Sequence, residues 1–131
     1  QPIFVKNSTN KFLIQEYELI GDKTVNRKII SQLNLKKNPN KKSGYVLALS
    51  SFKKIEIAAK DKTGNASKFN TNITVNIKIS KNNNLIKEKS FSENYNYSNS
   101  ENKFDLLQYQ KNIDNNLIEK ITEEIILFLN T

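Results

Sequence analysis

The chain has 131 residues, a length that fits one domain with a single hydrophobic core. Its formal net charge of +8 and its pI near 9.6 favour an anionic partner such as nucleic acid, a membrane surface or an acidic glycolipid. The absence of His and Cys excludes His-based triads, Cys nucleophiles, disulfide bonds and most metal sites.

The positive charge has a second explanation, which the sequence leaves open. All but one of the basic residues are Lys, and Asn, Lys and Ile dominate the whole chain. A compositional bias of this kind produces the same excess of Lys with no ligand behind it. No apolar run approaches the roughly 20 residues of a membrane-spanning helix.

The N-terminal segment predicts an arm followed by a strand. Residues 1–11 are polar around a short cluster, Pro2 to Phe4, and we expect an extended arm there. Because the first residue is Gln rather than Met, we also expect a leader, a tag or a lipid anchor upstream of it. The alternating stretch Phe12 to Ile20 predicts a strand that ends at Gly21.

Apolar residues at helical spacing then predict a helix from about Lys23 to Leu35. Asp22 or Thr24 can cap it, because a side-chain oxygen there accepts from the unpaired N–H groups of the first turn. The stretch Lys36 to Gly44 is expected to be a loop, since it is polar and its Pro prevents helical continuation.

The strand from Lys68 to Ser80 has the clearest pattern in the chain. Apolar or β-branched residues alternate with polar ones throughout, which is typical of a strand with one buried and one solvated face. The expected buried face consists of Phe69, Thr71, Ile73, Val75, Ile77 and Ile79. At about 3.3 Å per residue this strand is roughly 40 Å long.

Two further strands are expected to form an antiparallel meander with it. Tyr45 to Ala59 precedes it across a hairpin turn at Asp61 to Asn65, and Leu85 to Tyr97 follows it across a second turn at Lys81 to Asn84. The last strand is the more polar, so we expect it near a sheet edge. Polar residues interrupt the drier face of the first strand, which predicts a bulge near Ser50 to Lys54.

The chain closes with a long predicted helix from Lys103 to Asn130, for which Ser100 is the expected N-cap. Its apolar residues recur at intervals of three and four and make one broad stripe. At about 1.5 Å per residue the helix is close to 40 Å long, which matches the central strand. We therefore expect the helix to lie along the buried face of that strand for its full length.

These elements predict an α+β fold. The order β-α-β-β-β-α gives a two-layer sandwich, in which two helices pack on one face of a four-stranded antiparallel or mixed sheet. Residues 1–131 are expected to form a single domain.

The sequence predicts no catalytic site, no cofactor and no metal site. The carboxylates Glu119, Glu123 and Glu124 are expected opposite the apolar stripe, and Glu119 with Glu123 has the spacing of a solvated helix face. Three Gly in the whole chain leave no phosphate-binding loop. We therefore do not expect an enzyme.

The Lys residues gather in a few places, among them the hairpin set Lys60, Lys62 and Lys68. Such residues can contact phosphate groups through charge. Recognition of nucleic acid more often uses Arg and exposed aromatic rings, and Arg27 is the only Arg of the chain. A module that binds double-stranded RNA by its shape remains an alternative.

Four features resemble the LptE family, the lipoproteins that assist lipopolysaccharide assembly in Gram-negative outer membranes. The arm Gln1 to Phe4 looks like the segment that follows the lipidated Cys of mature members, and Lys62-Thr63-Gly64 looks like the family's basic-x-Gly turn before a long strand. Phe91 to Tyr97 resembles its Ser-Tyr-Asn strand end, and Phe104 to Leu129 resembles its C-terminal helix. This chain departs from the family in having no Cys and in lacking the usual Ala and Arg of its helices.

The resemblance implies a non-enzymatic protein at the periplasmic face of the outer membrane, lipid-anchored in its full-length form. It implies lipopolysaccharide as a ligand and the β-barrel protein LptD as a partner, which members of the family plug, and no nucleic acid. By position in the motif, the resemblance assigns ligand contact to Lys62 and, second, to Lys103. Lys60 and Lys68 are added because their charges lie near Lys62 in the sequence.

Two rival functions remain at this point. One is a periplasmic accessory lipoprotein of similar shape that binds protein partners only. The other is the double-stranded RNA-binding module.

Overall fold

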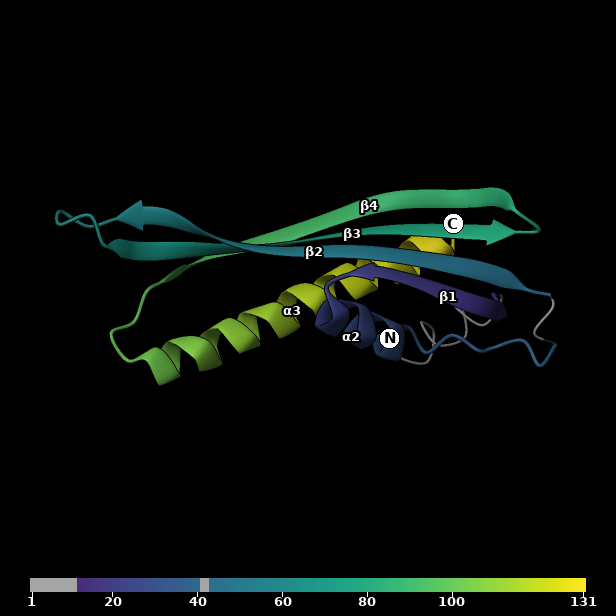
Figure 1. The fold of residues 1–131 in the computed structure, drawn as a ribbon, viewed down its shortest axis with the longest axis horizontal. Coiled ribbons are helices and arrows are strands. Elements are labelled where there is room, and N and C mark those ends of the chain that lie inside the picture. The colour runs from purple at the N-terminus through teal and green to yellow at the C-terminus, as the bar shows by residue number, and fades with distance from the viewer. Residues whose placement is uncertain (1–11, 41–42) are drawn as a thin grey trace.

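The computed structural model describes residues 12–40 and 43–131, and the predicted arm at residues 1–11 lies outside the described residues. The elements follow one another as β-α-β-β-β-α, which confirms the predicted order (Figure 1). They are β1 (Ile14–Gly21), α2 (Lys23–Leu33), β2 (Tyr45–Lys60), β3 (Ala66–Lys81), β4 (Asn84–Ser98) and α3 (Lys103–Leu129).

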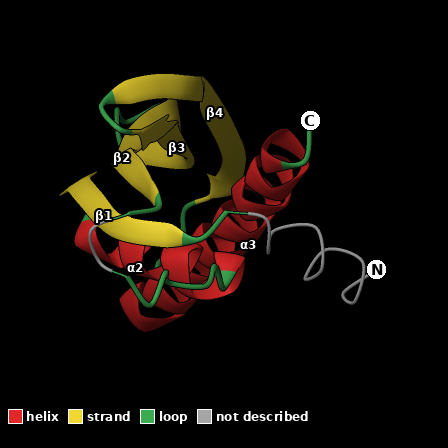
Figure 2. Ribbon diagram, turned by 90° about the vertical axis from the view of Figure 1, so that its right-hand side faces the viewer, coloured by secondary structure: helices red, strands yellow, loops and turns green. Residues whose placement is uncertain are grey.

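The four strands form one mixed sheet in the order β1-β2-β3-β4. β1 runs parallel to β2, whereas β2, β3 and β4 form the predicted antiparallel meander. The polar strand β4 lies at an edge, as expected. Figure 2 shows both helices on the same side of the sheet, so the predicted α+β two-layer arrangement is confirmed.

The core lies between β3 and the C-terminal half of α3. The side chains of β3 that alternate from Thr71 to Ile79 are all fully buried, as the pattern predicts. On α3 the buried residues start only at Ile113 and continue to Leu129. Full burial of an Ile or Leu side chain contributes about 1.5–3 kcal/mol, so this half of the helix holds the domain together.

The predicted full-length contact between helix and strand is wrong. Figure 1 shows α3 crossing under the sheet and diverging from it toward the β2–β3 hairpin. The N-terminal residues Phe104 and Leu107 are 74% and 66% exposed. The right-handed twist of a sheet turns a long hairpin away from a straight helix. In addition, polar side chains such as Lys53 and Asp114 occupy the point where helix and sheet separate.

The predicted bulge near Ser50 to Lys54 is also wrong. The register between β2 and β3 is continuous from Val46 to Ile57 and shifts only around Ala59. The polar interruption of β2 has another cause, because the side chains of Ser51 and Lys53 face polar groups of the helices. The Ser51 hydroxyl donates to Asn26 Oδ1 of α2 at 2.7 Å, and Lys53 Nζ lies 2.7 Å from Asp114 Oδ2 of α3.

The helix ends differ slightly from the prediction. Asp22 caps α2, since its carboxylate accepts from the backbone N–H of Val25. This helix ends at Leu33 rather than Leu35, because Asn34 adopts the left-handed conformation that closes a helix. α3 is capped by Asn102 and not by Ser100. The Asn102 side chain accepts from the backbone N–H groups of Phe104 and Asp105 in the first turn, where the partial positive charge of the helix lies.

Candidate ligand-binding surface

The β2–β3 hairpin ends in a turn that its own side chains hold together. One carboxylate oxygen of Asp61 accepts from the N–H of Thr63, the hydroxyl of Thr63 and the N–H of Asn65, at 2.9, 2.7 and 2.9 Å. The hydrogen bond from Thr63, followed by that from Asn65, lowers the pKa of Asp61. Gly64 adopts a φ of +89°, which a residue without Cβ adopts at little cost. The backbone at Lys62 is therefore held in one conformation.

Three of the four predicted site residues lie on this hairpin. Lys60 ends β2, Lys62 belongs to the turn, and Lys68 lies on β3, where it pairs with Ala59. All three side chains are exposed, and none forms an ion pair with another described residue. With Asp61 as the acidic residue of the turn, this hairpin tip carries an excess of positive charge.

The fourth predicted residue, Lys103, starts α3 and is separate from the other three. The connection before it is tied to the base of the hairpin, because Asn99 donates from its backbone N–H to Ser67 and from its side chain to Ala66. Lys103 therefore lies at the same end of the molecule. Glu101 precedes it and Asp105 follows it, so the local charge there is not positive.

Apolar side chains of the hairpin and of the start of α3 are exposed where these two elements diverge (Figure 1). Ile55 and Ile57 lie on the side of β2 that faces the helices, yet they are 43% and 52% exposed. Phe104 and Leu107 on α3 are more exposed still. We call these four residues the apolar surface.

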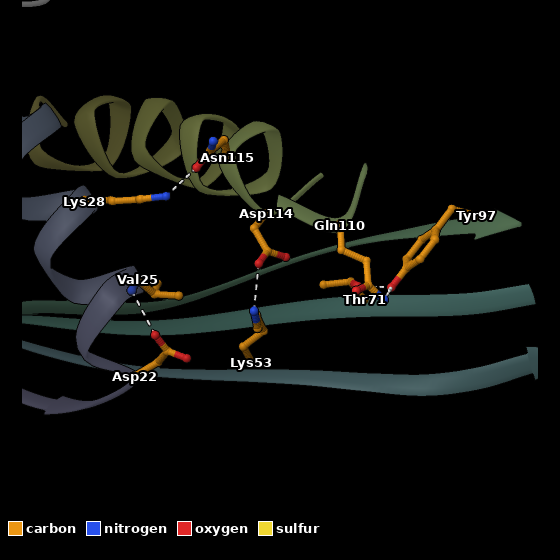
Figure 3. Close-up of polar contacts among 9 residues, drawn as sticks. All are labelled: Asp22, Val25, Lys28, Lys53, Thr71, Tyr97, Gln110, Asp114 and Asn115. Atoms are coloured by element: carbon orange, nitrogen blue, oxygen red, sulfur yellow. Dashed lines mark hydrogen bonds and ion pairs between the residues drawn. The ribbon is translucent and has the colours of Figure 1, made fainter. Parts of the chain in front are cut away.

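A groove of about 240 Å³ continues this surface between β2, α2 and α3. Its apolar lining includes Ile55 and Leu107. Its polar contacts are drawn in Figure 3, where Lys53 Nζ lies 2.7 Å from Asp114 Oδ2 and Lys28 donates to Asn115 at 2.5 Å. The residues that line it are Asp22, Thr24, Val25, Lys28, Lys53, Ile55, Leu107, Gln110, Lys111, Asp114 and Ile118.

The apolar surface was missed by the sequence analysis, which counted these residues toward the packed stripes of strand and helix. The available signal was the polar pair of Lys53 on β2 and Asp114 on α3. Each residue interrupts the apolar pattern of its own element, and the ion pair between them lies where the buried contact between the sheet and α3 ends.

The acidic residues of α3 differ in one respect from a simple solvated face. Glu119 and Glu123 are exposed as predicted, but Glu124 is half-buried. Burial, followed by repulsion from Glu93 of β4, raises the pKa of Glu124. Glu93 itself pairs with Lys120 at 3.3 Å. In the described parts of the chain no group of three or more potential metal-ligating His, Cys, Asp or Glu occurs.

No family model and no curated protein matches this sequence. Solved structures of bacterial lipoproteins share its fold. The rare lipoprotein B of Shewanella oneidensis aligns with a TM-score of 0.52 and 12% identity, covering 86% of this chain and 98% of its own. A minor lipoprotein of Acinetobacter baumannii aligns with a TM-score of 0.61 and 12% identity, covering 91% and 92%. Lipoprotein B of Nitrosomonas europaea aligns with a TM-score of 0.62 and 9% identity, covering 91% and 83%.

Proposed function

We propose that this protein is a non-enzymatic lipoprotein of the LptE type, which binds lipopolysaccharide and supports an LptD-type β-barrel at the periplasmic face of the outer membrane. The observation that carries this proposal is the pairing of a cationic hairpin tip with an exposed apolar surface at the same end of the molecule. Lipopolysaccharide has the complementary composition, since phosphates sit beside acyl chains in its lipid A part.

The fold is consistent with this proposal. Proteins that share the fold are named as bacterial lipoproteins. A lipid anchor on the full-length protein would hold the domain near a membrane surface. Within the described residues neither helix is long and apolar enough to span a membrane.

The charges of the tip and the apolar surface are expected to act on different parts of the ligand. Lys62, Lys60 and Lys68 would contact phosphates through charge, with Lys103 as a second element of the same end. Ile55 and Leu107 would cover part of an acyl chain, at about 0.8 kcal/mol for each CH₂ group removed from water.

The proposal is tested by titrating the domain with labelled lipopolysaccharide at several salt concentrations. Lys62→Glu is expected to weaken binding at least tenfold. The matched control is Lys36→Glu, which makes the same charge change on an exposed residue near the start of β1, at the opposite end of the sheet. Equal losses for both variants would mean that only net charge matters.

A second candidate function is an accessory lipoprotein that contacts proteins only. The open edge of β2 favours it, because β1 pairs with β2 only as far as Ser51 and the residues from Phe52 onward have no second strand beside them in the described structure. An extended strand of a partner could pair there. Absence of saturable lipopolysaccharide binding by the unmodified protein would favour this candidate, and equal binding of lipopolysaccharide and duplex RNA would indicate a purely electrostatic surface.

A further inference from the structure

A second cleft, of about 510 Å³, lies between β4 and α3 and is separate from the hairpin tip. Aromatic rings and amide side chains dominate its lining, with one Lys and two buried aliphatic residues. The lining residues are Asn94, Tyr95, Tyr109, Asn112, Ile113, Asn116, Leu117 and Lys120. None of these residues is acidic.

The helical part of the cleft follows directly from the spacing of the sequence. Tyr109, Asn112, Asn116 and Lys120 recur at three and four residues, so they lie along one face of α3. This face runs beside the buried stripe of Ile113 and Leu117, which packs against the sheet. Because packing of the stripe fixes the helix, the four polar residues are held toward the edge strand β4.

Two tyrosine rings of the cleft are available to a ligand. Tyr95 is 51% and Tyr109 is 44% exposed, and neither hydroxyl has a hydrogen-bond partner among the described residues. The Tyr109 ring meets Tyr97 edge to face, with centroids 5.8 Å apart. Tyr97 is fixed in turn, since its hydroxyl shares a hydrogen bond with Thr71 and accepts one from Gln110 (Figure 3). The Tyr109 ring is thus positioned before any ligand binds.

Two of the three amide side chains of the cleft are also available, whereas Asn94 Oδ1 accepts a hydrogen bond from Asn70. The side chains of Asn112 and Asn116 make no hydrogen bond to any described residue, and both are exposed. An amide offers two donors and one acceptor oxygen, which matches adjacent hydroxyl groups that both donate and accept. The single Lys is already paired with Glu93 at 3.3 Å. The cleft therefore offers hydrogen bonds and flat apolar faces and little net charge.

We propose that this cleft binds a saccharide. The apolar face of a pyranose ring would stack on Tyr109 or Tyr95, and its hydroxyls would bond to Asn112 and Asn116. A phosphate is a poorer fit, because the only basic residue that lines the cleft, Lys120, is already paired with Glu93. The geometry of the cleft carries this inference, and only the choice of probe rests on the proposed function.

The probe is the core oligosaccharide released from lipopolysaccharide by mild acid, which lacks acyl chains and the lipid A phosphates. Binding is followed by ¹⁵N NMR of the Asn side-chain amides and by tyrosine fluorescence, which is readable because the chain has no Trp. We expect saturable shifts at Asn112 and Asn116 that change little between 50 and 500 mM salt. The double variant Asn112→Ala/Asn116→Ala, which favours helix at both positions, is expected to weaken binding about tenfold.

The matched control is Gln108→Ala, an exposed α3 residue outside the cleft, which should leave oligosaccharide binding unchanged. Absence of saturable shifts, shifts confined to residues outside the cleft, or equal binding by the double variant would each overturn the inference. The outcome is separable from that of the proposed function. Intact lipopolysaccharide binding lost by Lys62→Glu, with no oligosaccharide binding, would refute the cleft alone. Oligosaccharide binding at the cleft, with lipopolysaccharide insensitive to Lys62→Glu, would refute the hairpin site alone.

Discussion

The divergence of α3 from the sheet can be tested by two truncations on the same helix, Ile121→Ala and Leu107→Ala. Ile121 is fully buried, whereas Leu107 is 66% exposed. Truncating a buried Ile to Ala costs about 2–5 kcal/mol, and the better helix propensity of Ala returns about 0.5 kcal/mol. The Leu107 side chain is only about a third buried, and full burial contributes about 1.5–3 kcal/mol, so the expected cost of its truncation is about 0.5–1 kcal/mol.

Urea denaturation followed by far-UV circular dichroism measures both costs in free energy of unfolding. A domain of this size has about 5–15 kcal/mol of stability, so the Ile121→Ala variant should still fold. Equal slopes of free energy against urea would show that both variants unfold from the same compact state. A cost above about 2 kcal/mol for Leu107→Ala would mean that the start of α3 is packed in solution. The apolar surface would then be unavailable to a ligand, and the reasoning behind the proposed site would fail.

Three further perturbations test single features of the fold. Gly21→Ala should destabilise the domain by about 1–3 kcal/mol, measured by thermal unfolding. Gly21 has a φ of +97°, and an added Cβ would lie 1.9 Å from the carbonyl oxygen of Ser51. An unchanged Tm would contradict that geometry. Asn102→Ala should lower the free energy of unfolding in urea by about 1 kcal/mol, because α3 loses its N-cap. An effect near zero would mean that another residue caps the helix. Glu124→Gln should raise the Tm at pH 7, because burial and Glu93 raise the pKa of Glu124 and its ionised form therefore destabilises the folded state. The gain should vanish at about pH 3, where the carboxyl is protonated in both the folded and unfolded states, and a gain that persists there would refute the electrostatic cause.

Much of the fold could be predicted because its periodicities are strong. The alternation from Lys68 to Ser80 and the stripe of α3 from Ile113 onward both follow directly from burial on one face, and the structure has both. The sequence could not reveal how far the two faces stay in contact. That extent depends on the twist of the sheet and on pairs such as Lys53 with Asp114, which are 61 residues apart.

The candidate sites were harder to predict from the sequence than the fold. Local spacing brings Lys60, Lys62 and Lys68 onto one hairpin, and this was predictable. The apolar surface beside them could not be predicted, because it exists only where the start of α3 diverges from the sheet that it was predicted to contact. The cleft between β4 and α3 combines Tyr109 and Asn112 of α3 with Tyr95 of β4, and only the crossing of helix and strand brings them together.

The central claim, that one amphiphilic ligand spans the hairpin tip and the apolar surface, is tested most directly on the unmodified protein. Its affinity for intact lipopolysaccharide is compared with that for the deacylated form, which keeps the phosphates. We expect saturable binding of both, with the deacylated form at least tenfold weaker and more easily displaced by salt, because charge alone would then hold it. Equal affinities for the two forms, or no saturable binding of intact lipopolysaccharide, would contradict the account.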